Sequence, residues 1–138
     1  MRFKTDLSYD DRDSKARYVA DKYASILKGR ILDVGADRCY LRDLLPANTN
    51  YTGIGLGGAT DIEVNLETSP IPFPNNSYDC VLCLDVLEHL DSIHAVFDEL
   101  GRVSSRYIII SLPNPYRDFI GMLLRQGNPA INFKYYGL

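Results

Sequence analysis

An apolar run that ends in an acidic residue and a glycine most constrains how this chain can fold. It covers residues 30–39, RILDVGADRC, and a helical pattern follows it. A parallel strand that meets a helix in this way presents backbone N–H groups and the positive end of the helix to a ligand, and a glycine such as Gly35 lets that ligand approach closely. The stretch therefore predicts the first strand of a nucleotide-type binding site.

Length and charge exclude several classes of protein. The chain has 138 residues, which is the length of one domain, so we expect a single domain over residues 1–138. The chain has fifteen Lys and Arg and eighteen Asp and Glu, which gives a formal charge of −3. There is thus no excess of positive charge that would bind the phosphates of a nucleic acid. We find no apolar run of about 18 residues and no signal-peptide core. These features predict a cytoplasmic protein with no nucleic-acid partner and no membrane span.

The cysteines favour the same compartment. Cys39, Cys80 and Cys83 are an odd number of thiols and do not resemble a disulfide framework. Cys80 and Cys83 have the spacing of a redox or metal pair, but they lie in a strand-like run. Residues three apart on a strand point to opposite faces, so we expect two separate buried thiols and no metal site.

Strands and helices alternate along the chain. Helices are predicted over residues 10–28, 40–45 and 93–103, the last behind an Asp91-Ser92 cap, and a loop over 70–77. Strands are predicted over residues 31–34, 51–55, 61–65, 78–84 and 107–112. This order indicates right-handed βαβ units and a doubly wound, mostly parallel sheet, an α/β fold of the Rossmann-like type.

Five segments resemble, in order and spacing, the class I S-adenosylmethionine (SAM)-dependent methyltransferases of the type 11 kind. They are LDVG at 32–35, YTGI at 51–54, IPFPNNSYDCV at 71–81, DVLEHL at 85–90 and ELGRV at 99–103. The similarity extends over residues 16–115. The proline-aromatic-proline loop, followed by Tyr-Asp, a strand and Leu-Glu-His, is its most specific part, whereas an acid-x-Gly turn occurs in many dinucleotide folds.

The resemblance implies SAM as the cofactor and places its site residue by residue. The first loop would cradle the methionine half, the end of the second strand would bind the ribose, a position after the third strand would meet the adenine, and the end of the fourth strand would line the methionine side. The implied residues are Asp33, Gly35, Ala36 and Asp37 in the loop, Gly55 for the ribose, Asn65 and Leu66 for the adenine, and Leu84 and Asp85 on the methionine side; Leu56, next to Gly55, is a further predicted cofactor-binding residue.

Three of the positions depart from the family's pattern. Asp37 and Cys39 replace loop glycines, and a non-glycine residue at positive φ costs roughly 1–2 kcal/mol and adds bulk where the cofactor should lie. Gly55 replaces the acid that binds the ribose, and the loss of such bonds costs on the order of 1.5–3 kcal/mol. Together they predict SAM binding weakened by roughly a hundredfold or more. Asp37 also places a negative charge near the SAM carboxylate, which is unfavourable unless Arg38 neutralises it.

His89 is the candidate catalytic base near the cleft. Methyl transfer depends mainly on the alignment of the nucleophile with the methyl carbon, so a dedicated base is optional. Alternatively, Asp85 and Glu88 form a helix-capping pair, and His89 packs at the start of that helix.

Three classes of function stay open. The first is a SAM-dependent methyltransferase that acts on a small molecule or a glycan; the C-terminal residues 132–138 resemble family members from surface-polysaccharide clusters and favour a glycan. The second is a non-catalytic, methyltransferase-like binding or scaffolding module, which Asp37, Cys39 and Gly55 favour. The third is another nucleotide-binding Rossmann protein, but the second strand lacks the acid that NAD recognition uses.

The C-terminal part of the chain gives an expectation about assembly. After residue 112 the sequence offers no obvious antiparallel strands of the kind that complete a class I methyltransferase sheet. The apolar strand at 107–110 would then have an exposed edge, which proteins usually cover or pair. We expect residues 116–138 either to fold over that edge or to join a homodimer interface.

Overall fold

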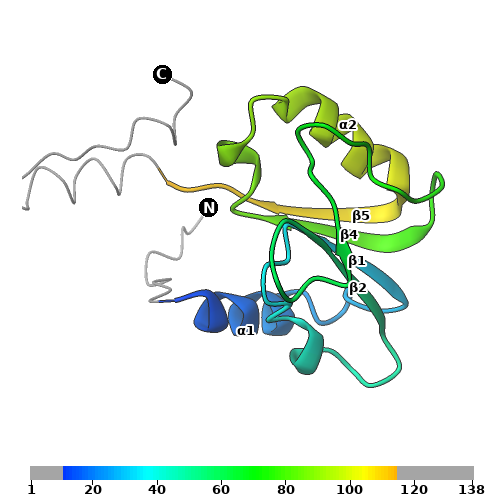
Figure 1. Ribbon diagram of the computed structural model, residues 1–138. Coiled ribbons are helices and arrows are strands. Elements are labelled where there is room, and N and C mark those ends of the chain that lie inside the picture. Colours follow the sequence, from blue (N-terminus) through cyan, green and yellow to red (C-terminus); the bar gives the residue numbers. More distant parts are fainter. Residues whose placement is uncertain (1–10, 115–138) are drawn as a thin grey trace, which may run out of the picture.

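The computed structural model describes residues 11–114, which form helices and strands around one sheet (Figure 1). In chain order the elements are α1 (Arg12–Lys22), β1 (Arg30–Val34), the 3-10 helix η1 (Arg42–Leu44), β2 (Asn50–Gly55), β3 (Ile62–Glu63), β4 (Tyr78–Leu84), the 3-10 helix η2 (Leu87–His89), α2 (Ile93–Val103) and β5 (Ser104–Ser111). The bounds of β4 and α2 are those predicted from the sequence.

The five strands form one parallel sheet in the order β3-β2-β1-β4-β5. β1 lies at the centre and pairs with β2 on one side and with β4 on the other. The strand order reverses at this point, and α/β sheets of this kind bind ligands in the crevice outside the carboxyl ends of the strands there. The predicted doubly wound, parallel architecture is confirmed.

Each face of the sheet carries its own apolar core. α2 covers one face and α1 the other (Figure 1). Cys83 belongs to the core under α2, whereas Cys80 belongs to the core under α1. Both thiols are free and buried, and burial raises the pKa of each to about 12. The prediction that these two sulfurs lie on opposite faces is confirmed.

Two predicted helices are shorter in the structure. α1 begins behind a capping box, in which Asp11 Oδ1 accepts a 2.7 Å bond from the Ser14 N–H, and it ends at Lys22 instead of reaching residue 28. The helix predicted over 40–45 is only the single turn η1. Leu45 is extended because it precedes Pro46, and a proline disfavours the helical conformation of the residue before it.

The start of α2 is stabilised by a residue distant in sequence. The Ser92 side chain makes no capping bond within the helix. Instead, the carboxylate of Glu67 accepts bonds from the Asp91 N–H at 2.6 Å, the Ser92 N–H at 3.2 Å and the Ser92 hydroxyl at 2.8 Å. A carboxylate is favourable at this positive end of a helix.

β5 forms an edge of the sheet among the described residues, which contain no antiparallel strand. Tyr107 and Ile108 are 45% and 38% exposed on it. The expectation that residues 116–138 cover this edge falls outside the described part of the chain. Between residues 11 and 114, no helix has the length and apolarity needed to cross a bilayer.

Candidate functional site

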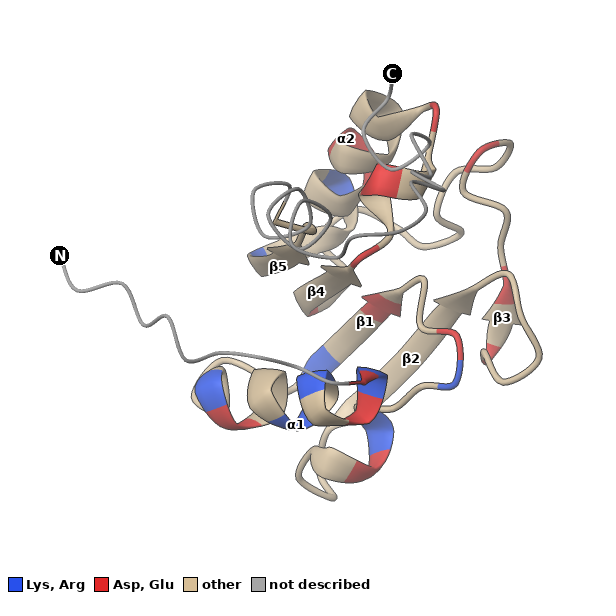
Figure 2. Ribbon diagram, turned by 90° about the vertical axis from the view of Figure 1, so that its left-hand side faces the viewer, with Lys and Arg blue, Asp and Glu red and all other residues tan. Residues whose placement is uncertain are grey.

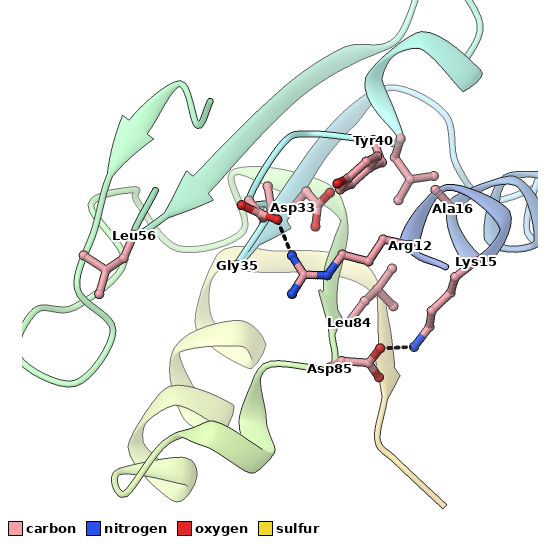
Figure 3. A pocket seen from close by; sticks show the side chains of 12 residues that line it. Arg12, Lys15, Ala16, Asp33, Gly35, Tyr40, Leu56, Leu84 and Asp85 are labelled. Carbon is pink, nitrogen blue, oxygen red and sulfur yellow. Dashed lines mark hydrogen bonds and ion pairs between the residues drawn. The ribbon is translucent and has the colours of Figure 1, made fainter. Parts of the chain in front are cut away.

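A cavity of about 310 Å³ opens at the carboxyl ends of β1, β2 and β4 (Figure 3). This is the crevice where a sheet of this topology is expected to bind a ligand. It is lined by Arg12, Lys15 and Ala16 of α1, by Asp33, Gly35, Ala36, Asp37, Tyr40 and Leu41 of β1 and the loop after it, by Leu56 after β2, and by Leu84 and Asp85 at the end of β4.

Most of the residues implied by the resemblance line this cavity. They are Asp33, Gly35, Ala36, Asp37, Leu56, Leu84 and Asp85. Four other sequence-predicted residues do not line the cavity. Asn65 accepts a 3.0 Å bond from the Glu67 N–H, and Leu66 packs against the core under α2. His89 is exposed on η2, and Gly55 lies against the back of the first loop.

Gly55 cannot simply be exchanged for the missing ribose acid. Its φ is +154°, in the region that favours glycine, and a Cβ there would lie 3.2 Å from Gly35 Cα. Ile54 holds the same loop through its carbonyl oxygen, which accepts bonds from the N–H groups of Gly35 at 2.7 Å and Ala36 at 3.1 Å. The loop therefore lies directly on β2 at the point where a family member would carry a carboxylate.

Gly35 is required by packing as well as by backbone conformation. Its φ is +79°, and a Cβ at this position would overlap the Val86 side chain. The absence of a side chain thus lets the first loop lie against the segment that follows β4. The position of Gly35 in the cavity wall therefore depends on its close contact with Val86 and on its hydrogen bond to the Ile54 carbonyl.

Asp37 and Cys39 adopt the left-handed conformation that glycines would adopt there, with φ of 49° and 53°. The bulk of Cys39, however, lies outside the cavity lining, so that expectation was wrong. The Cys39 thiol donates a 3.3 Å bond to the Ala59 carbonyl and occupies the space beside Gly53, whose Cβ would be 2.5 Å from Sγ. Gly53 thereby makes room for Cys39.

Two ion pairs link α1 to the cavity acids. Arg12 pairs with Asp37, and Lys15 pairs with Asp85 (Figure 3). Arg38, the residue considered from the sequence as a partner of Asp37, is exposed and is not among the cavity residues. Arg12 and Lys15 were missed from the sequence, where the only signal is two cations three positions apart near the start of an amphipathic helix.

Asp33 is the carboxylate of the cavity that has no ion pair within residues 11–114. It is only 6% exposed, and the Tyr51 hydroxyl donates a 2.6 Å bond to Oδ2. Burial raises the pKa of Asp33 to about 6, and the bond from Tyr51 opposes this shift. At neutral pH the group is mainly charged, so it gives the cavity one negative charge that α1 does not balance.

Asp85 and Glu88 do not form a helix-capping pair. η2 begins after Val86 and has no side-chain capping bond. Asp85 instead pairs with Lys15, while Glu88 Oε2 is buried without a hydrogen-bond partner among the described atoms. Burial also raises the pKa of Glu88.

Comparison with known proteins adds a family and a fold. A family described as "Methyltransferase domain" matches residues 32–106. No curated protein matches the chain.

Solved structures share the fold. A SAM-dependent methyltransferase from Archaeoglobus fulgidus is 18% identical, with a TM-score of 0.61 over 82% of this chain and 59% of its own. Magnesium protoporphyrin IX methyltransferase from Synechocystis PCC 6803, with bound S-adenosylhomocysteine (SAH), is 17% identical, with a TM-score of 0.55 over 88% and 71%.

The cyclase SpnF is 20% identical, with a TM-score of 0.55 over 67% of this chain and 40% of its own. The present chain thus spans less than two thirds of the length of the cyclase and of the Archaeoglobus protein. At these identities the likeness shows the fold alone.

Proposed function

This chain belongs to the methyltransferase domain family, and from that premise we propose that it binds SAM in the cavity beside Gly35 and transfers the methyl group to a small molecule or a glycan. SAM is the cofactor of this family. The observation that carries the proposal is the position of the cavity at the carboxyl ends of β1, β2 and β4, beside the glycine loop. This is the ligand-binding crevice of the fold.

The residues present fit the cofactor at two of its three parts. Asp33 offers an unbalanced, buried carboxylate to a positively charged group. Leu56 is 61% exposed and offers an apolar surface to the flat face of an adenine. The ribose lacks its usual acid, because Gly55 occupies that position. The site therefore supports a cofactor that is held mainly by its charged amino-acid end and by its adenine.

The chain's own residues would bind the cofactor through charge and promote transfer through position. SAM, when bound, supplies a methyl group on a positively charged sulfonium. Asp33 and Leu84 lie on the wall where the end of β1 meets the end of β4. A carboxylate there would favour binding of the positively charged cofactor, while the rate of transfer would depend on the alignment of the acceptor with the methyl group. His89 stays a proposed base, and alignment of the acceptor would suffice without it.

A second function is supported by a specific observation, the lack of space for an acid at Gly55. A relative that has lost the ribose contact can keep the fold as a binding or scaffolding module, because folds of this class serve several functions.

Calorimetric titration with SAM and SAH tests the proposal. We expect one ligand per chain and weaker binding of both ligands to Asp33→Asn, with SAM losing more because it carries the sulfonium. A folded chain that binds neither ligand would overturn the proposal. Binding without methyl transfer to any member of a panel of small-molecule and glycan acceptors would instead favour the binding module.

Location and assembly form part of the same proposal. Cys39, Cys80 and Cys83 are buried free thiols, which are typical of the reducing cytoplasm. The formal charge of −3 favours a small-molecule or glycan acceptor over nucleic acid. The exposed edge of β5 supports a homodimer, which light scattering on the purified chain would detect.

A further inference from the structure

We propose that Arg12 binds the carboxylate of an amino-acid-bearing ligand in the cavity, and that it exchanges Asp37 for that carboxylate when the ligand enters. The inference rests on the proposed function and assigns the recognition of the charged end of the cofactor to α1. It follows from the different ways in which the two α1 cations that line the cavity, Arg12 and Lys15, are held.

Arg12 lies at the first position of α1 and reaches into the cavity toward the loop at Gly35 (Figure 3). Its guanidinium meets Asp37 of that loop. The Arg12 side chain is 71% exposed, and this ion pair is the one recorded for it within residues 11–114. Exposed pairs of this kind contribute little to stability, so the exchange of one carboxylate for another costs little.

Lys15 is held in a different way. Its side chain is only 18% exposed, and it pairs with Asp85 and donates a 2.8 Å bond to the Ser111 hydroxyl. That hydroxyl in turn donates a 2.8 Å bond to Asp85 Oδ1. This network joins α1, β4 and β5. Lys15 is therefore the fixed cation of the cavity wall, and Arg12 is the one that can change partner.

The charges of the cavity match an amino-acid end. When Arg12 turns to the ligand carboxylate, Asp37 becomes available to the ligand ammonium group, so each charge that is released finds a new partner. A planar guanidinium also binds a carboxylate through two parallel bonds. Asp33, which has no cation of its own in the described structure, remains for the positive charge nearest the end of β1.

Titration with a pair of ligands isolates this contact. SAH carries the amino-acid end, whereas 5′-methylthioadenosine has the same adenine, ribose and sulfur without it. We expect Arg12→Gln to weaken SAH binding about tenfold, as the loss of a charged hydrogen bond implies, and to leave 5′-methylthioadenosine binding unchanged. Arg12→Lys should recover part of the loss because it keeps the charge.

Arg17 provides a matched control. It lies on the same helix, its side chain is 62% exposed, and it donates a 2.8 Å bond to Asp13 outside the cavity lining. Arg17→Gln should change the affinity of neither ligand. Retained 5′-methylthioadenosine binding shows that an Arg12 variant is folded.

The outcomes separate the two proposals. An Arg12→Gln variant that binds SAH as well as the parent, or that loses both ligands equally, would overturn the role of Arg12 while the proposed function stands. A parent chain that binds neither ligand would overturn the proposed function and the carboxylate site with it.

Discussion

The half of the sheet that carries β4 and β5 differs from the half that carries β2 and β3 in length, burial and helical cover. β4 has seven residues and β5 has eight, and α2 packs over them. β3 has two residues, both exposed, and the connection between β1 and β2 holds only the three-residue helix η1. Figure 2 shows β3 as a short strand at the far edge.

The candidate site lies between the two halves, and this difference explains why its residues are held firmly on one side and are exposed on the other. On the long half, Asp85 is fixed by Lys15 and by Ser111. On the short half, Leu56 is an exposed apolar residue beside the glycine that replaces the ribose acid. We infer that affinity for a ligand comes mainly from the side of the cavity made by α1, β1 and β4.

Truncation of one apolar side chain in each half should give the largest difference in the free energy of unfolding. Leu82 in β4 is completely buried, whereas Ile62 in β3 is 39% exposed. We expect Leu82→Ala to lower the free energy of unfolding by about 3 kcal/mol, and Ile62→Ala by less than about 1 kcal/mol. Urea denaturation measures both changes. Equal losses would show that the short half is as tightly packed as the long one.

Gly35 joins the two halves, so a side chain there should be nearly as damaging. Gly35→Ala combines a strained backbone with an overlap at Val86, and we expect a loss of about 2–3 kcal/mol. Gly58→Ala is the control, because a Cβ at Gly58 meets nothing within 4 Å. A Gly35 variant as stable as this control would contradict the packing seen against Val86.

Asp33 should make the stability of the protein fall as the pH rises from about 4 to about 6. Its pKa is about 6 in the folded chain and near 3.8 when exposed. Between these values the folded state binds more protons than the unfolded state, so stability is lost as the folded carboxyl ionises. Asp33→Asn should raise the free energy of unfolding at pH 7 by about 2 kcal/mol and flatten this part of the curve.

Thermal denaturation of the parent and of Asp33→Asn across that pH range provides the measurement. Tyr51→Phe is a useful companion, since it removes the 2.6 Å bond but keeps the charge. If the stability curves of the parent and of Asp33→Asn are parallel from pH 4 to 7, Asp33 is not the titrating group.

Glu67 tests the contact between the short half and α2. Its carboxylate accepts three bonds at the start of the helix, and Glu67→Gln should cost about 1 kcal/mol through loss of the charge at the positive helix end. The effect should shrink in high salt. Glu63→Gln, on the exposed β3, is the matched control and should cost almost nothing.

Sequence reasoning predicted the long half well because its patterns are local. The apolar run of β4 and the helical spacing of α2 each determine an element on their own. The short half was less predictable: Leu45 is extended before Pro46, and Cys39 packs into a space created by Gly53. Arg12 and Lys15 were missed because their partners, Asp37 and Asp85, lie 25 and 70 positions away along the chain.

The space beside Gly53 couples the residue sizes that are possible at positions 39 and 53. A Cβ at residue 53 would stand 2.5 Å from the Cys39 sulfur and 3.0 Å from Ala36 Cβ. A side chain at 53 is therefore incompatible with the present position of the Cys39 sulfur, and either residue can change size only if the other allows it. A glycine at 39 would remove the sulfur from this space and leave the Ala36 contact as the tighter limit on a side chain at 53, so the two positions are coupled through the room available to one sulfur atom.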